Sequence, residues 1–188
     1  MSARVGVLIL ILAVVVGLSA CGPRPAPELT PGEDELTGIA AFEVADQGAR
    51  FIVGPLPFGW KRMMLEGGAT VGFTNRFHDQ TIFVNVLYAP NRRAGLTALR
   101  NHLLFDLTSR EILEQETIEV DNREALWTVI KGRLDGARVK MALVVVRIDD
   151  WVYDLAYIAV PETYEICLAD FRQMVNAFHH KRNYPDAE

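Results

Sequence analysis

The sequence predicts an α+β domain with helices on both faces of a mostly antiparallel sheet, and two observations support this prediction. Asp135-Gly136 separates two long β-type segments, and Asp-Gly is a strong signal for a tight β-hairpin. Residues 141–146, Met-Ala-Leu-Val-Val-Val, are apolar at every position. A strand of this kind is buried on both faces, so we expect a helix on each side of the sheet.

The first half of the domain is expected to contain short strands and one helix. Residues 51–53, 69–75 and 81–87 are rich in β-branched and aromatic side chains, which favours strands. Residues 55–60 contain two prolines and a glycine, which indicates an irregular segment. A helix is predicted from leucines that recur with helical spacing: Leu96, Leu99, Leu103, Leu104 and Leu107.

The second half is predicted to be an antiparallel meander followed by a helix. A short strand at 117–120 leads through a turn into longer strands at 125–134, 137–148 and 151–159. Pro161 is expected to open the last helix, where its missing N–H costs little. The apolar stripe of that helix recurs over four turns and consists of Tyr164, Cys167, Leu168, Phe171, Met174, Val175 and Phe178.

The N-terminus contains the most specific motif of the chain. An apolar run at residues 5–18 begins behind a single basic residue and ends in small residues and a cysteine. The tetrapeptide Leu18-Ser19-Ala20-Cys21 resembles the bacterial lipobox, which signal peptidase II recognises. This resemblance implies cleavage before Cys21 and attachment of a diacylglycerol to its thiol.

The length of the apolar run fits a signal peptide. Its 14 residues span about 21 Å as a helix, whereas a hydrocarbon core is ~30 Å thick. A short apolar run with a basic start is typical of a signal h-region. An uncleaved membrane anchor and an ordinary secretory signal are the alternatives, and both leave the position of Cys21 unexplained.

The chain is expected to be one domain held to a membrane by a tether. Gly22, rather than aspartate, follows Cys21, which implies export to the outer membrane with the domain facing the periplasm. Alternating prolines hold the segment after Cys21 extended. The expected parts are a signal peptide at 1–20, the lipidated cysteine and proline-rich tether at 21–41, the α+β domain at 42–181 and a tail at 182–188.

Charge and cysteine content exclude several classes of protein. The chain has 19 basic and 24 acidic residues, and removal of residues 1–20 takes away only Arg4, which leaves a net charge of −6. A mildly acidic chain has no electrostatic reason to bind nucleic acid. With Cys21 used by the lipid, Cys167 has no disulfide partner, and its place on the apolar stripe predicts a buried, inert thiol.

No catalytic constellation is visible, so we expect a protein that is not an enzyme and needs no metal or cofactor. Ser109 is the single serine after residue 20 and lacks a Gly-x-Ser-x-Gly context. His179 and His180 are adjacent and would diverge on a helix, while His78-Asp79 is explained by a polar turn. Ligand contact remains an alternative to core packing for four aromatic residues: Trp60, Trp127, Trp151 and Tyr153.

The order of elements resembles the PsbP-like fold. The resemblance rests on Pro-Phe-Gly-Trp at 57–60, the leucine-rich helix, the strand Trp-Val-Tyr-Asp-Leu-Ala-Tyr at 151–157 and the helix that ends at 171–178. This fold is known from the photosystem II extrinsic subunit, a Ran-binding nuclear import factor and many bacterial lipoproteins. The resemblance implies an α/β/α sandwich around an antiparallel sheet over about residues 42–180, and a role in binding or assembling other proteins.

Two functions follow as expectations. The first is a lipid-anchored, non-catalytic module of the cell envelope that binds or assembles an envelope protein. The second is a carrier or sensor of a small apolar ligand such as a lipid, for which a cavity between the sheet and the last helix would be needed.

Overall fold

The structure is a computed structural model that describes residues 38–63, 65, 70–90 and 94–182. The predicted signal peptide, the lipobox with Cys21 and the tether up to residue 37 lie outside the described residues. The fold includes the end of the predicted tether, because Ile39 is buried and forms an antiparallel bridge with Leu56.

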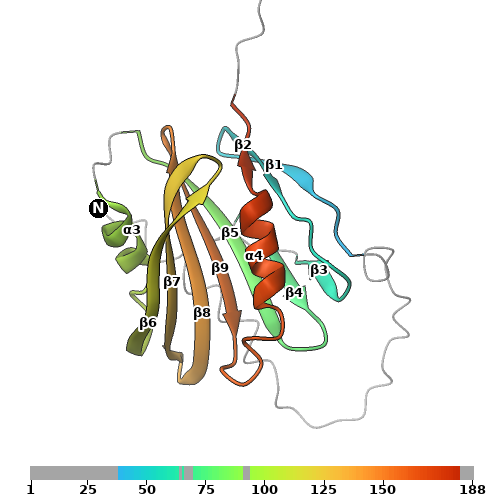
Figure 1. The fold of residues 1–188 in the computed structure, drawn as a ribbon, viewed down its shortest axis with the longest axis vertical. Helices are drawn as coiled ribbons and strands as arrows, with labels where there is room; N and C mark the ends of the chain where they lie inside the picture. Colours follow the sequence, from blue (N-terminus) through green and yellow to red (C-terminus); the bar gives the residue numbers. More distant parts are fainter. Residues whose placement is uncertain (1–37, 64, 66–69, 91–93, 183–188) are drawn as a thin grey trace, which may run out of the picture.

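Antiparallel strands form two sheets (Figure 1). The order in the larger sheet is β3 (Trp60–Arg62), β4 (Val71–Asn75), β5 (Gln80–Tyr88), β9 (Trp151–Ala159), β8 (Ala137–Ile148), β7 (Arg123–Leu134) and β6 (Leu107–Val120). The smaller sheet consists of β1 (Phe42–Asp46), β2 (Ala49–Val53) and β10 (His179–His180). The two described helices are α3 (Leu96–Leu103) and α4 (Leu168–Ala177), and neither is long and apolar enough to cross a membrane.

The larger sheet is covered on both faces, as the sequence predicts. Helix α4 and the smaller sheet pack on one face, where the ring of Phe171 lies 5.8 Å from Trp127 and 5.7 Å from Tyr157. Helix α3 covers part of the other face through Leu99, which clusters with Val145 of β8. The α+β class is therefore confirmed; the small second sheet is an addition that the sequence did not predict.

The central hairpin also agrees with the prediction. Asp135 and Gly136 both have positive φ, 44° and 83°, as a tight turn between β7 and β8 requires. All six residues at 141–146 are buried, because α4 and the smaller sheet cover one side of β8 and α3 with its neighbouring leucines covers the other.

The first predicted helix was too long and the strand after it too short. Helix α3 ends at Leu103, and Leu107 instead begins β6, which continues for 14 residues to Val120. Most of β6 is exposed and interrupted by register shifts, and Ser109 has a φ of 49°. An edge strand of this kind lacks the apolar alternation by which strands are recognised in a sequence.

The last helix begins at Leu168, not at Pro161 as predicted. Residues 161–166 form turns whose carbonyl groups are bound by side chains of the sheet. The Gln80 amide donates to the Thr163 carbonyl at 2.6 Å, and the Tyr157 hydroxyl donates to the Tyr164 carbonyl at 2.7 Å. These bonds replace the i to i+4 bonds that a helix would make there.

Candidate functional site

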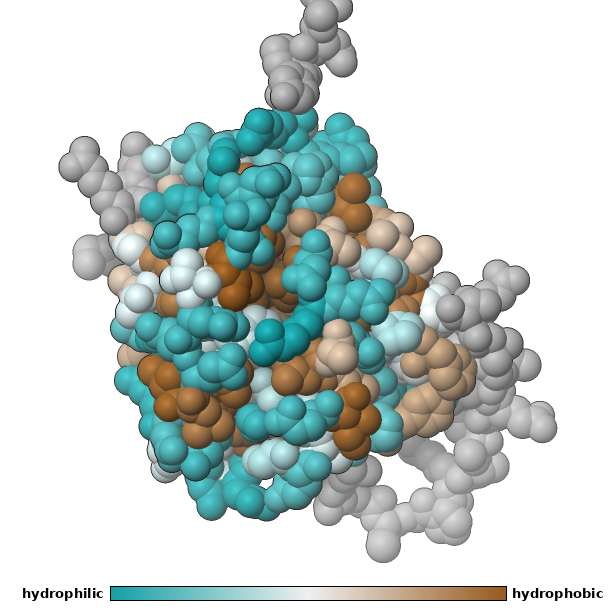
Figure 2. Space-filling view, in the orientation of Figure 1, coloured by the Kyte–Doolittle hydropathy of each residue, from teal (hydrophilic) through white to brown (hydrophobic). Residues whose placement is uncertain are grey.

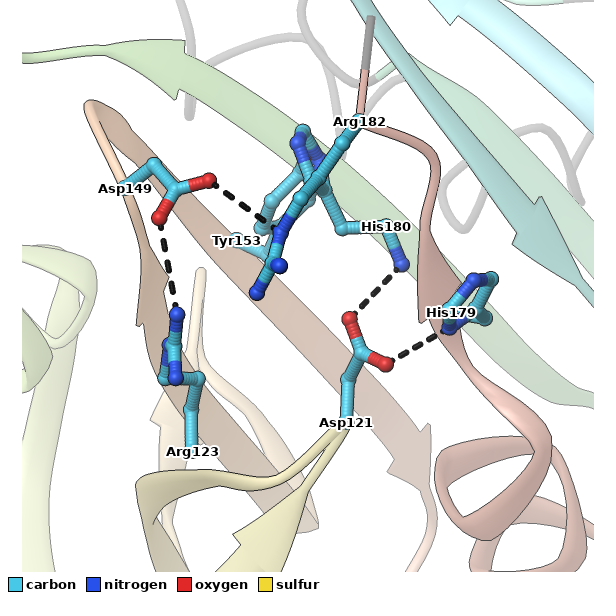
Figure 3. Close-up of polar contacts among 7 residues, drawn as sticks. All are labelled: Asp121, Arg123, Asp149, Tyr153, His179, His180 and Arg182. Carbon is cyan, nitrogen blue, oxygen red and sulfur yellow. Dashed lines mark hydrogen bonds and ion pairs between the residues drawn. The ribbon is translucent and has the colours of Figure 1, made fainter. Parts of the chain in front are cut away.

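One end of the larger sheet gathers polar side chains from the β6–β7 turn, the β8–β9 turn and β10 (Figure 3). Asp121 and Asn122 of the first turn have positive φ, 50° and 59°, and the Asp121 carboxylate bridges to β10. Its Oδ1 lies 2.6 Å from Nδ1 of His179, and its Oδ2 accepts the backbone N–H of His180 at 3.1 Å. This carboxylate therefore fastens the end of the chain to the larger sheet.

The side chain of His180 turns inward from β10 and is only 6% exposed. Its Nδ1 lies 2.5 Å from the hydroxyl of Tyr153, a buried residue of β9. Burial lowers the pKa of His180, against the opposing effect of the carboxylates of Asp149 and Asp121, and burial raises the pKa of Tyr153. Both groups are thus neutral, and the pair is satisfied when the phenol donates to an unprotonated Nδ1.

Asp149 is the second carboxylate group of interest at this end. It lies 3.5 Å from the Arg123 guanidinium and 3.8 Å from Nε of Arg182. A pocket of about 310 Å³ opens beside it, lined by Gly48, Asp149, Asp150, Trp151, His180, Lys181 and Arg182. The lining combines both signs of charge with one indole ring, which suits a small polar molecule better than an apolar one.

The chemistry available at this end is binding and fastening. Tyr153 is hydrogen-bonded to His180, and the Asp121 carboxylate binds His179 and the backbone of His180 at the chain end. Throughout the described ranges, no group of three or more His, Cys, Asp or Glu side chains is arranged to hold a metal ion.

A second candidate surface is the outer edge of β6. This strand ends the seven-stranded sheet, and no described strand pairs with its outer side. Ile112 and Leu113 lie in the middle of it with about half of their surface exposed. Lys131 pairs with Glu111 at 2.9 Å, and Arg172 with Glu114 at 3.7 Å. The edge therefore offers unpaired backbone groups beside exposed apolar side chains, as a strand-binding surface does.

The structure accounts for the aromatic residues that the sequence left open. Trp60 is buried and donates from Nε1 to Oδ2 of Asp170 at 2.8 Å. Trp127 is buried beneath the Arg172 guanidinium, which lies 4.1 Å from the ring centroid. Of the four, Trp151 lines the pocket and Tyr153 binds His180 below it.

Cys167 is buried as predicted, although it precedes α4 instead of lying within it. The thiol is 5% exposed, and burial raises its pKa to about 11. The Asn75 amide donates to its sulfur at 3.6 Å. His78-Asp79 lies in the predicted polar turn, where the His78 carbonyl accepts the Thr163 hydroxyl at 3.4 Å.

His179 and His180 diverge as predicted, but they do so on a strand and not on a helix. The helix ends at Ala177, Phe178 is extended with a ψ of 132°, and the two histidines form β10. Their partner Asp121 lies 58 residues away from His179, so no local pattern could have joined them. The signal that could have been used is that successive side chains of a strand point to opposite sides, which places the ring of His179 on one side of β10 and the ring of His180 on the other.

Aromatic rings fill the space between α4 and the sheet. Phe171 and Met174 of α4 are fully buried against Trp127 and Tyr157. The described part of the chain thus gives no support to the alternative of an apolar carrier, which needs a cavity at this place.

The sequence matches no protein-family model and no curated protein. Solved structures are similar in fold. Cyanobacterial PsbP (CyanoP) from Synechocystis sp. PCC 6803 aligns with a TM-score of 0.55 at 13% identity, over 87% of this chain and 99% of that protein. LpqN, involved in cell envelope biogenesis of Mycobacterium tuberculosis, aligns with a TM-score of 0.57 at 12% identity, over 76% of this chain and 91% of LpqN.

A third structure, from Bacteroides thetaiotaomicron, aligns with a TM-score of 0.50 at 13% identity, and the alignment spans 72% of this chain and 47% of that one. Similarity at such low identity establishes the fold: this chain has the PsbP-like α+β architecture.

Proposed function

We propose that this chain is a lipid-anchored, non-catalytic module of the bacterial cell envelope that binds a protein partner along the free edge of β6. The observation that carries this proposal is the edge itself, 14 residues long and exposed from Thr108 to Thr117. A strand of another protein can add to such an edge through backbone hydrogen bonds, while side chains select the partner.

The side chains of β6 define the partner's chemistry. Ile112 and Leu113 offer apolar contact, and Glu116 and Glu119 add exposed carboxylates further along the strand. We therefore expect a partner strand with apolar residues flanked by lysine or arginine. The acidic side chains also keep β6 from pairing with β6 of a second copy, because like charges would face each other.

The membrane part of the proposal rests on the lipobox. Cys21 would carry the lipid, and Gly22 supports a place in the outer membrane with the domain in the periplasm. The PsbP-like fold shared with LpqN, a protein involved in cell envelope biogenesis, is consistent with an envelope role. Two or more acyl chains give the lasting attachment that such a role needs.

Site-specific photocrosslinking in cells tests the protein-binding claim. A photoreactive phenylalanine at Leu113 is expected to capture one discrete protein, and the same group at Tyr88, a similarly exposed residue of β5, is the matched control. With the probe kept at position 113, Ile112→Lys should abolish the capture, because a lysine on an edge strand opposes strand addition. Equal capture at both positions, or none at Leu113, would contradict the proposal.

Cell fractionation tests the anchor separately. Cys21→Ala is expected to release the domain from membranes or to leave it as uncleaved precursor. A mutant chain that stays membrane-bound and is normally processed would show that Cys21 is not the anchor.

A further inference from the structure

An exposed aromatic pair lies at the opposite edge of the larger sheet. Phe58, just before β3, and Phe77, in the β4–β5 turn, are 56% and 62% exposed. Their ring centroids are 5.6 Å apart. In Figure 2, tan and brown surface lies over the position that β3 has in Figure 1. The two rings thus form an exposed apolar surface.

The backbone around the pair fixes the rings in this exposed position. Gly59 has a φ of 99°, and a side chain there would meet the Phe77 ring at 3.0 Å. The Gly59 carbonyl accepts the N–H of Arg76 at 3.1 Å, and the buried side chain of Asn75 accepts the N–H of Phe77 at 3.0 Å. These hydrogen bonds fix the backbone of both loops, so the two exposed rings belong to an ordered surface and not to a loose loop end.

The tether enters the domain directly beside this pair. Gly38 lies close to the segment before β3. A Cβ added to Gly38 would be 2.9 Å from the Pro57 carbonyl carbon and 3.0 Å from the Phe58 backbone nitrogen. Only 16 residues separate Gly38 from Cys21, so this end lies within ~60 Å of the lipidated residue even at full extension.

The two segments that carry the pair are basic, unlike the chain as a whole. Residues 57–62 and 76–79 contain three basic side chains, Lys61, Arg62 and Arg76, and one acidic side chain, Asp79. The chain as a whole carries a net charge of −5. Basic residues beside exposed aromatic rings are the combination that favours an anionic lipid surface.

We propose that the Phe58–Phe77 end of the domain contacts the anionic bilayer surface into which Cys21 is anchored. The inference rests on the proposed lipid anchor and adds an orientation to it. In the strand order, β3 and β6 are the two edges of a seven-stranded sheet. Six spacings of ~4.8 Å place these edges about 29 Å apart. Contact through the β3 edge thus leaves the β6 edge directed away from the lipid and free for a protein partner.

Fluorescent probes on the acylated protein test this orientation. Phe77→Cys is labelled with an environment-sensitive nitrobenzoxadiazole group; Cys167 is buried and Cys21 is blocked, so the label goes to the introduced thiol. Phe105→Cys is the matched control, because Phe105 is 85% exposed and lies between α3 and β6, on the side opposite β3 in Figure 1. A third variant, Phe58→Cys, guards against a local disturbance at Phe77.

The labelled proteins are reconstituted into protein-free vesicles of phosphatidylcholine and phosphatidylglycerol. We expect a blue-shifted emission and severalfold stronger quenching by nitroxide lipids at positions 58 and 77 than at 105, with a smaller difference when phosphatidylglycerol is omitted. Equal, water-like emission at all three positions of an acylated chain would overturn the orientation alone. A blue shift that appears only in native membranes would assign the surface to a protein and would also overturn it.

The intact mass of each preparation separates the two proposals. A chain whose Cys21 carries no acyl group would overturn the anchor and the orientation together.

Discussion

The hydrogen bond between Tyr153 and His180 provides a sharp test of how the chain end is held. In Tyr153→Phe, the ring keeps its contacts with Phe51 and Phe178, whose centroids lie 5.3 Å and 5.0 Å away. The change removes only the hydroxyl that lies 2.5 Å from Nδ1 of His180. His180 is 6% exposed, and leaving a buried nitrogen of this kind without its partner costs about 1–3 kcal/mol.

Urea denaturation followed by tryptophan fluorescence measures this cost. We expect the free energy of unfolding of Tyr153→Phe to fall by about 1–3 kcal/mol with an unchanged m-value. Tyr88→Phe is the control, because Tyr88 is half exposed and the hydroxyl it loses is not in the core. If both variants lose less than about 0.5 kcal/mol, the bond does not hold β10 and the reasoning is refuted.

Three further predictions follow from the same structure. Gly132→Ala should lower the free energy of unfolding, measured in urea, by about 1–3 kcal/mol, because the added Cβ would lie 2.7 Å from Leu107 Cγ and 2.9 Å from the Thr108 carbonyl oxygen. Gly95→Ala is the control and should change stability little, because no atom lies within 4 Å of its added Cβ. Stability should decrease as the pH falls below about 6.5, because His180 takes up a proton in the unfolded chain, whereas burial lowers its pKa in the folded protein. A His180→Gln variant whose stability falls with pH just as steeply would contradict this. Cys167, whose pKa is raised to about 11, should resist thiol reagents at neutral pH in the native protein and react promptly in urea.

The sequence was most informative where local patterns and burial agree. The Asp135-Gly136 turn and the continuous apolar run at 141–146 identified the centre of the sheet, because both signals are contained in neighbouring residues. The coverage of both faces of the sheet followed from that run alone.

Elements whose partners are distant were missed. Residues 108–117 of β6 are exposed and most of them are polar, so this part of the sequence lacks an apolar stripe. The start of α4 was misplaced because Gln80 and Tyr157, both on strands, take carbonyl groups that a helix would use. Likewise, Asp121 meets β10 only through the tertiary fold.

The aromatic pair was missed for a different reason. Phe58 and Phe77 are ordinary apolar residues in the sequence, and only the structure places both rings outside the core and the backbone of Phe58 beside Gly38. An exposed apolar residue is informative when its backbone is fixed and a second such residue contacts it.

Native mass spectrometry of the protein, extracted from its own membranes in mild detergent, tests the central claim most directly. The account predicts a mature chain that begins at Cys21, carries the mass of its acyl chains and retains a discrete additional protein mass. A chain with an unmodified Cys21 and no bound protein would contradict the proposal of a lipid-anchored binding module.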